Sequence, residues 1–302
     1  MDLPLFTGDE DPVAPYVAGS GVPWPGSVAL YSATQDAGYG LNRFPTSALV
    51  IGQTQTVLQK ACSWLLDRSP VLRVKMIRGN VKSLSVDQLL SEANLAVIGD
   101  GSAQNWEVFQ FAQAEIVNEN TFDLCVRFRG QAGSNAVEPD QWPEGSIFVL
   151  LDGRPQQIEL ASSARDVMQH YRYGPGTRPL SDPSYQYRTD AFSGIGLRPY
   201  SVCHLQATPS GAGLDVSWIR RARIGGDAWG EQDVPLSKSF ERYVVRVFKA
   251  GVQTRQTTVS EPNWTYTRQM NLADGAGETR IDVAQTSDTY GEGPVVTLTL
   301  AA

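Results

Sequence analysis

The sequence predicts an all-β protein, in which an antiparallel β-rich N-terminal body is followed by a C-terminal β-sandwich. Its 302 residues suggest two domains of about 100–200 residues each. The 28 glycines and 18 prolines supply many turns, and the apolar residues fall in short runs rather than in long helical patterns. Hydrophobic residues make up 41% of the chain and charged residues 19%, which is enough apolar material for sizeable cores.

Three segments with different patterns divide the chain. Residues 1–26 are rich in proline, glycine and acidic residues, which predicts an extended arm lying on its own body or on a neighbouring protein. Residues 27–198 form the β-rich body. The stretch from Gly194 to Ser201 has the pattern of a linker, so residues 199–302 form the second domain.

Short apolar runs predict the strands of the body. They lie at residues 28–31, 48–51, 71–77, 95–98 and 146–151, and residues 157–160 are expected to pair with the last run. In the third run, Leu72, Val74 and Met76 share one face. Ser85 is a suitable N-cap for one short helix.

Residues 106–129 have the clearest hairpin pattern of the chain. Two alternating stretches, 106–117 and 122–129, flank a turn at 118–121. Alternation in the second stretch predicts one buried face, made of Phe122, Leu124, Val126 and Phe128. It predicts a second, solvent-facing side, which carries Asp123, Arg127 and Arg129 together with Cys125.

Seven further short runs predict the strands of the second domain. They lie at residues 202–207, 214–219, 242–248, 254–259, 264–267, 279–285 and 294–300. Their order is that of a fibronectin type III sandwich, in which Trp218 would be the core tryptophan. The pattern leaves no place for a helix within residues 240–300.

Charge and cysteine content disfavour several classes of function. The formal net charge of −7 and the pI of about 5.0 argue against nucleic-acid binding, which needs a basic surface. Cys62, Cys125 and Cys203 are too sparse for a disulfide framework or a zinc knuckle and are expected to be buried as small hydrophobes. Neither a signal-peptide pattern nor an apolar stretch of about 20 residues is present, so we expect synthesis in the cytoplasm and no transmembrane segment.

The motifs of common enzyme classes are weak or missing. Asp100 and Asp152 stand beside glycines, where aspartates usually form turns, and nothing singles out a glycosidase carboxylate pair. His170 and His204 are not accompanied by a Gly-x-Ser-x-Gly motif, and no phosphate-binding loop occurs. We therefore expect no enzyme, and no catalytic, cofactor-binding or metal-binding residues.

Three aromatic residues are the candidates for contact with a receptor or partner. Trp229, Trp264 and Tyr290 lie near expected loops of the sandwich. Exposed aromatic side chains at loop tips suit contact with a sugar or a protein. The alternative is that each ring closes the end of its own domain.

Several stretches, taken in order, resemble the C-terminal region of the large tail-tip protein of gene transfer agents and related siphophages of alphaproteobacteria. That protein is often called the megatron or host-specificity protein. The stretches are residues 23–31 (PWPGSVALY), 36–39 (DAGY), 98–101 (IGDG), 105–111 (NWEVFQF), 127–133 (RFRGQAG), 149–153 (VLLDG), 194–200 (GIGLRPY), 216–221 (VSWIRR) and 291–294 (GEGP). They are spread over nearly the whole chain, which makes the resemblance more specific than any single motif.

The resemblance implies a structural protein of the distal tail, near the baseplate hub, with three copies around the tail axis of a virion or gene transfer agent particle. It would contribute to assembly and host-surface engagement, and its partners would be other tail-tip and hub proteins and a host receptor or glycan. Family members are far longer, so either the gene is split here or the sequence is a fragment. Two alternatives stay open, a soluble carbohydrate-binding module and an envelope-glycan hydrolase.

Overall fold

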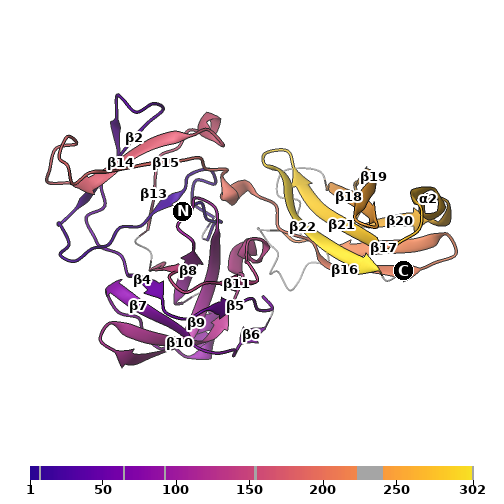
Figure 1. The fold of residues 1–302 in the computed structure, drawn as a ribbon, viewed down its shortest axis with the longest axis horizontal. Coiled ribbons are helices and arrows are strands. Elements are labelled where there is room, and N and C mark those ends of the chain that lie inside the picture. Colours follow the sequence, from indigo (N-terminus) through magenta and orange to yellow (C-terminus); the bar gives the residue numbers. More distant parts are fainter. Residues whose placement is uncertain (7, 64, 92, 153–154, 223–240, 301–302) are drawn as a thin grey trace. The chain divides into compact units, whose positions relative to one another are not determined.

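The computed structural model describes residues 1–302 apart from 7, 64, 92, 153–154, 223–240 and 301–302. The chain divides into two compact units, Met1–Gly196 and Leu197–Ala302 (Figure 1). Strands make up most of the regular structure in both units, and the strand pairings among the described residues are antiparallel. The predicted all-β class is therefore confirmed.

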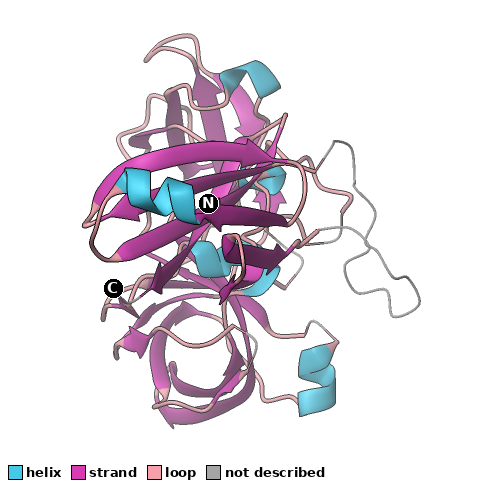
Figure 2. Cartoon of the chain, turned by 90° about the vertical axis from the view of Figure 1, so that its right-hand side faces the viewer, coloured by secondary structure: helices cyan, strands magenta, loops and turns pink. Residues whose placement is uncertain are grey.

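Six strands of the described part of the first unit form a sheet that closes on itself. They are β4 (Ile51–Thr54), β7 (Leu72–Arg78), β8 (Leu95–Gly99), β9 (Trp106–Asn118), β10 (Thr121–Phe128) and β12 (Ile147–Leu150). Their order is β10, β7, β4, β12, β8, β9, and β9 pairs back onto β10. Strands that curl round in this way are visible in the lower part of Figure 2. A further strand, β6 (Leu66–Asp67), pairs with the end of β10. We call this arrangement the closed sheet.

Apolar side chains on one face of each strand fill the closed sheet. Leu72, Val74 and Met76 of β7 are at most 3% exposed, which confirms the predicted alternation. Phe109 and Phe148 meet edge to face, with ring centroids 6.1 Å apart, in the same core. The interior is therefore a packed core.

A four-stranded sheet makes up another part of the first unit. Its order is β15 (Gln186–Asp190), β14 (Gln169–Pro175), β2 (Val28–Ala33) and β3 (Gly40–Arg43). The inner face contributes Leu30 and Tyr171 to a small core with Ile158 and Phe192. The shorter elements of this unit are β1 (Tyr16–Val17), β5 (Leu58–Gln59), α1 (Val86–Leu90), η1 (Gln131–Ala136), β11 (Gln141–Trp142), β13 (Gln156–Gln157), η2 (Ser162–Ala164) and η3 (Ile195–Leu197).

The N-terminal residues lie on their own body rather than projecting from it. The Asp2 carboxylate accepts hydrogen bonds from the backbone N–H groups of Ser193, Gly194 and Ile195, at 2.9, 3.0 and 2.8 Å. Leu3 is 2% exposed. The start of the chain is therefore fixed to the last residues of the first unit.

Local predictions in this unit had mixed outcomes. Ser85 caps α1 as expected, because its hydroxyl accepts from the Gln88 backbone while the Gln88 side chain accepts from Ser85. The predicted pairing of residues 157–160 with β12 is wrong. Strand β12 already pairs with β4 and β8, and β13 pairs with β1 instead. The cysteines are free, but Cys62 is exposed and the other two are half-buried, so their predicted burial is also wrong.

The predicted alternation of residues 122–129 holds for Phe122, Leu124 and Val126, which are at most 7% exposed, and fails after Val126. This residue has a φ of +53° and no partner in the ladder between β9 and β10, whereas Cys125 and Arg127 both pair. The register between the two strands is unchanged across Val126, so the left-handed backbone of this one residue, and not an inserted residue, breaks the alternation. Arg127 and Arg129, predicted to face solvent, are both 0% exposed.

The second unit is a sandwich of two antiparallel sheets. One has the order β16 (Cys203–Pro209), β17 (Gly213–Ile219), β20 (Asn263–Thr267), and the other β19 (Val252–Val259), β18 (Tyr243–Lys249), β21 (Thr279–Ser287), β22 (Gly291–Leu300). This three-plus-four order is the fibronectin type III-like arrangement that the strand pattern predicted. Trp218 is 4% exposed and meets Tyr243 edge to face at 5.1 Å, so it is a core residue as expected.

The expectation of no helix within residues 240–300 is wrong. Helix α2 (Arg268–Asp274) begins after the N-cap Thr267 and lies in the connection between β20 and β21. Asp274 holds its end by accepting from Arg255 at 2.9 Å and from the Tyr266 hydroxyl at 2.8 Å. The helix therefore occupies a loop and interrupts neither sheet.

Candidate functional site: a buried ionic cluster

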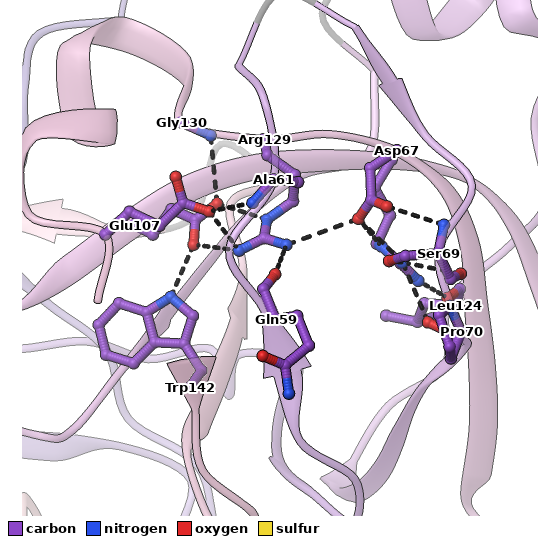
Figure 3. Close-up of polar contacts among 12 residues, drawn as sticks. Gln59, Ala61, Asp67, Ser69, Pro70, Glu107, Leu124, Arg129, Gly130 and Trp142 are labelled. Atoms are coloured by element: carbon purple, nitrogen blue, oxygen red, sulfur yellow. Dashed lines mark hydrogen bonds and ion pairs between the residues drawn. The ribbon is translucent and has the colours of Figure 1, made fainter. Parts of the chain in front are cut away.

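Five charged side chains form a buried cluster where β10 leaves the closed sheet (Figure 3). They are Asp67, Glu107, Arg127, Arg129 and Glu138, and each residue is at most 7% exposed. Strands β6, β9 and β10 supply the first three, and the other two lie in the chain that follows β10. We call this group the ionic cluster.

Arg129 is the centre of one half of the ionic cluster. Its Nε and Nη2 donate to the two carboxylate oxygens of Glu107 at 2.5 and 2.7 Å, and Nη2 also donates to Glu138 Oε1 at 2.8 Å. Its Nη1 donates to the Gln59 carbonyl at 2.8 Å. The Trp142 indole N–H donates to Glu107 Oε2 at 2.6 Å. These charge-assisted bonds join β5, β9 and β11, which are far apart in the sequence.

Arg127 is the centre of the other half. Its Nε donates to Asp67 Oδ2 at 2.9 Å, and its Nη1 donates to the Leu124 carbonyl at 2.7 Å. Its Nη2 donates to the Ser69 hydroxyl at 2.9 Å and to the Pro70 carbonyl at 3.1 Å. Arg127 therefore fixes the residues after β6 against β10.

The charges of the ionic cluster do not cancel when every group is ionised, since three carboxylates face two guanidinium groups. Burial and the neighbouring Glu107 carboxylate raise the pKa of Glu138 to about 7, although Arg129 opposes the shift. Burial alone would raise the pKa of Asp67, but hydrogen bonds from Ser69 and the charge of Arg127 lower it overall. Glu138 is thus the carboxyl that takes up a proton near neutral pH.

The ionic cluster is closed to substrates. The side chains of Glu107 and Arg129 are 0% exposed, and that of Glu138 is 1% exposed. A general acid or base must come within hydrogen-bond reach of the reacting group, which this burial prevents. Glu107 and Glu138, which are bridged by Arg129, therefore have a structural role: they fix loops to the closed sheet.

The sequence held one signal of this cluster. By the two-residue period of a strand, Glu107 shares a face with Phe109 and Phe111, which are both 0% exposed. A lone carboxylate on an apolar face needs a buried partner. Two arginines two residues apart near the end of the neighbouring strand were available to provide it.

The aromatic candidates from the sequence belong to the residue range of the second unit. Trp229 lies outside the described residues. Trp264 is on β20, where its ring stacks on Tyr266 at 5.6 Å and packs against the sandwich core. Tyr290 is half-buried in the turn between β21 and β22. A role of these residues in receptor contact stays a prediction.

A mainly apolar cavity of about 570 Å³ lies within the first unit. Val28, Leu30, Ile51, Ile147 and Tyr171 are among the residues that line it. Arg188 and Asp190 also line it, and they bond to each other, with Nη2 and Oδ1 2.9 Å apart. The cavity therefore presents an apolar wall and a neutralised ion pair.

The described residues hold no candidate metal centre and no candidate membrane span. Within them, no group of three or more His, Cys, Asp or Glu side chains is placed to hold a metal ion. None of the helices found there is long and apolar enough to cross a membrane.

Comparison with known proteins relates the closed sheet to one family. No curated protein matches the sequence. Among solved structures, the chain is similar to the chicken CNTN1 FN1–FN3 domains, with 12% identity and a TM-score of 0.23. That alignment covers 82% of this chain and 64% of the other, so this chain spans less than two thirds of that structure, and such a TM-score supports no further argument. Residues 49–149, from the start of the closed sheet to its strand β12, match the family described as Rcc01698-like, C-terminal.

Proposed function

We propose that this chain is a non-catalytic structural component of the distal tail of a phage or gene transfer agent. The observation that carries the proposal is the match of residues 49–149 to the Rcc01698-like C-terminal family. The matched range takes in the six strands of the closed sheet except Leu150, the last residue of β12. The resemblance to alphaproteobacterial tail-tip proteins extends over further stretches on both sides of this range.

The physical character of the first unit supports this proposal. A tail-tip protein must keep its shape while neighbouring subunits bind to it. The closed sheet pairs each of its strands on both sides, and the ionic cluster fixes the loops at one end of it. The buried carboxyl groups of the ionic cluster take part in these contacts, and their burial keeps them out of reach of a substrate.

We further propose that the chain occurs in three copies around the tail axis, contacts tail-tip and hub proteins, and contributes to host-surface engagement. Quantitative mass spectrometry of purified particles tests this arrangement. We expect the chain to be present at a fixed ratio to the major tail-tube protein, in a multiple of three copies per particle. Its absence from purified tails would contradict the proposal, and cryo-EM of intact particles would locate it relative to the axis.

Two alternatives predict different outcomes. A soluble carbohydrate-binding module would be found in the lysate and not in purified particles. An envelope-glycan hydrolase would release new reducing ends from purified cell-wall or capsule polysaccharide. We expect no such release, and a Glu107→Gln variant should behave as the unchanged chain does in this assay, because Glu107 is inaccessible.

A further inference from the structure

The outer face of the four-stranded sheet carries an ordered row of large side chains. In antiparallel sheets, directly paired residues project from the same face. Arg172 of β14 pairs with Tyr31 of β2 and with Tyr187 of β15, and Tyr31 pairs with Leu41 of β3. Tyr171, the neighbour of Arg172, is 4% exposed on the inner face. The row therefore runs across all four strands on the side away from the core.

Arg172 lies between two tyrosine rings. Its guanidinium carbon is 5.2 Å from the ring centroid of Tyr39 and 5.6 Å from that of Tyr187. Its Nη2 donates to Asp36 Oδ1 at 2.9 Å, and the Tyr39 hydroxyl donates to the same oxygen at 2.5 Å. Cation–π contacts with Arg172 hold both rings in position, and the carboxylate of Asp36 additionally fixes Tyr39.

Further contacts extend this fixed surface. His170, two residues before Arg172 on β14, hydrogen-bonds the Tyr187 hydroxyl through Nδ1 at 2.8 Å. Tyr185 packs 6.0 Å from Tyr31 and lies directly over Gly174, where a Cβ atom would come within 2.7 Å of its ring. We call Asp36, Tyr39, His170, Arg172 and Tyr187 the tyrosine–arginine face.

The tyrosine–arginine face still has groups able to bind a ligand. Tyr187 is 49% exposed, and the Asp36 side chain is 50% exposed. Within the part of the chain that the structure describes, Asp36 Oδ2 and His170 Nε2 make no hydrogen bond. Accessible rings therefore lie beside an open acceptor and an open imidazole nitrogen.

We propose that the tyrosine–arginine face binds a neutral saccharide. The C–H face of a pyranose packs on an aromatic ring, while its hydroxyl groups donate to carboxylates and bond to imidazole nitrogens. A neutral sugar is favoured over an acidic one because Asp36 already neutralises Arg172. Rings held by their own contacts lose little freedom on binding.

This inference goes beyond the proposed function and does not depend on it. Every residue of the tyrosine–arginine face belongs to the first unit, so the purified chain should bind saccharide outside any particle. Absence of the chain from tails would refute the proposed function and leave the saccharide site intact. Absence of saccharide binding would refute the site and leave the tail role intact.

The test is binding of the purified full chain to an array of neutral and acidic bacterial surface glycans, with affinities then measured by calorimetry on the bound glycans. We expect a neutral glycan to bind, Tyr187→Ala to weaken binding about tenfold or more, and Tyr187→Phe, which keeps the ring, to change it by less than about threefold. Leu272→Ala on α2, at a residue 83% exposed, is the control and should leave the affinity unchanged.

A second variant tests the charge argument. Asp36→Asn removes the countercharge of Arg172, so binding should shift from neutral towards acidic glycans. The proposal is wrong if the array shows no bound glycan, including the case in which the face captures only a protein. It is also wrong if Tyr187→Ala binds as tightly as the unchanged chain, or if Leu272→Ala weakens binding equally.

Discussion

At the residue scale, Arg129 illustrates how a buried charge depends on its partners. Its guanidinium group hydrogen-bonds the carboxylates of Glu107 and Glu138 at the same time, and the three side chains are at most 1% exposed. Removing one member of a buried ionic group leaves the others uncompensated, which costs more than the intact group contributes. The contribution of Arg129 is thus best measured as the decrease in the free energy of unfolding when its side chain is replaced.

We expect Arg129→Met to lower the free energy of unfolding by about 3–5 kcal/mol, because two buried carboxylates would lose their shared countercharge. Urea unfolding followed by circular dichroism measures this loss. Arg73→Met is the matched control, since the Arg73 side chain is 41% exposed in its bridge to Asp123 and its loss should cost less than about 1 kcal/mol. Equal costs for the two variants would contradict the account of the ionic cluster.

Glu138 should make stability depend on pH. Its pKa in the folded chain is about 7, compared with an ordinary value of 4.5, so the folded state holds the proton more tightly. The resulting stabilisation is complete below about pH 4.5 and is lost as the pH rises to about 7, by up to ~3 kcal/mol. Urea unfolding across this range should show the decline in the unchanged chain. Glu138→Gln should flatten it, and an unaltered slope in that variant would assign the effect to another group.

At the scale of elements, glycines allow the strands of the closed sheet to approach each other. A Cβ atom at Gly99 of β8 would come within 2.5 Å of the Trp106 ring and of the Asn105 carbonyl oxygen. Trp106 is only 5% exposed, so its ring has little room to move away.

Gly99→Ala should therefore destabilise the first unit by about 1–3 kcal/mol, the usual cost of overpacking a core. Gly40→Ala in β3 is the control, because nothing lies within 4 Å of its Cβ position, and it should be neutral or slightly stabilising. Thermal unfolding of both variants gives the comparison. A stable Gly99→Ala variant would mean that β8 and β9 can separate at little cost.

The sequence predicted local structure better than long-range pairing. Apolar alternation located β7, β9 and the strands of the sandwich, since a strand with one buried face shows this period wherever it pairs. The hairpin of β9 and β10 was predicted correctly because the two strands are adjacent in the sequence. Alternation contains no record of distant partners, and so the pairing of β10 with β7 and that of β13 with β1 were not predicted.

The ionic cluster escaped prediction for a related reason. One residue with left-handed backbone, Val126, breaks the alternation before the two arginines, and no side-chain pattern in the sequence indicates this backbone conformation. The tyrosine–arginine face was not foreseen either. Its members come from loop 36–39, β14 and β15, which meet only through the pairing of the folded sheet.

At the scale of the whole molecule, each unit has its own core. Trp218 belongs to the core of the second unit, and Phe148 belongs to that of the first. No described residue is shared between these two cores. Each unit should therefore respond separately to a change in its interior.

Trp218→Ala should cost about 3–5 kcal/mol within the second unit. Hydrogen exchange followed by mass spectrometry should then show faster exchange in β17, β18 and β21, with exchange in β7 and β12 unchanged. Phe148→Ala should give the opposite pattern. Faster exchange throughout the chain in either variant would indicate that the two units unfold together.

The closed sheet has a consequence for crowded surroundings. A strand at an open edge can exchange its partner for the same strand of a nearby copy, which leads to swapped or aggregated chains. Strand β10 is hydrogen-bonded on both sides, by β7 and by β9, so it has no free edge at which a strand of another copy could pair. Copies of the chain that accumulate before assembly would thus not exchange strands of this sheet. They would contact each other only through the surfaces of folded chains.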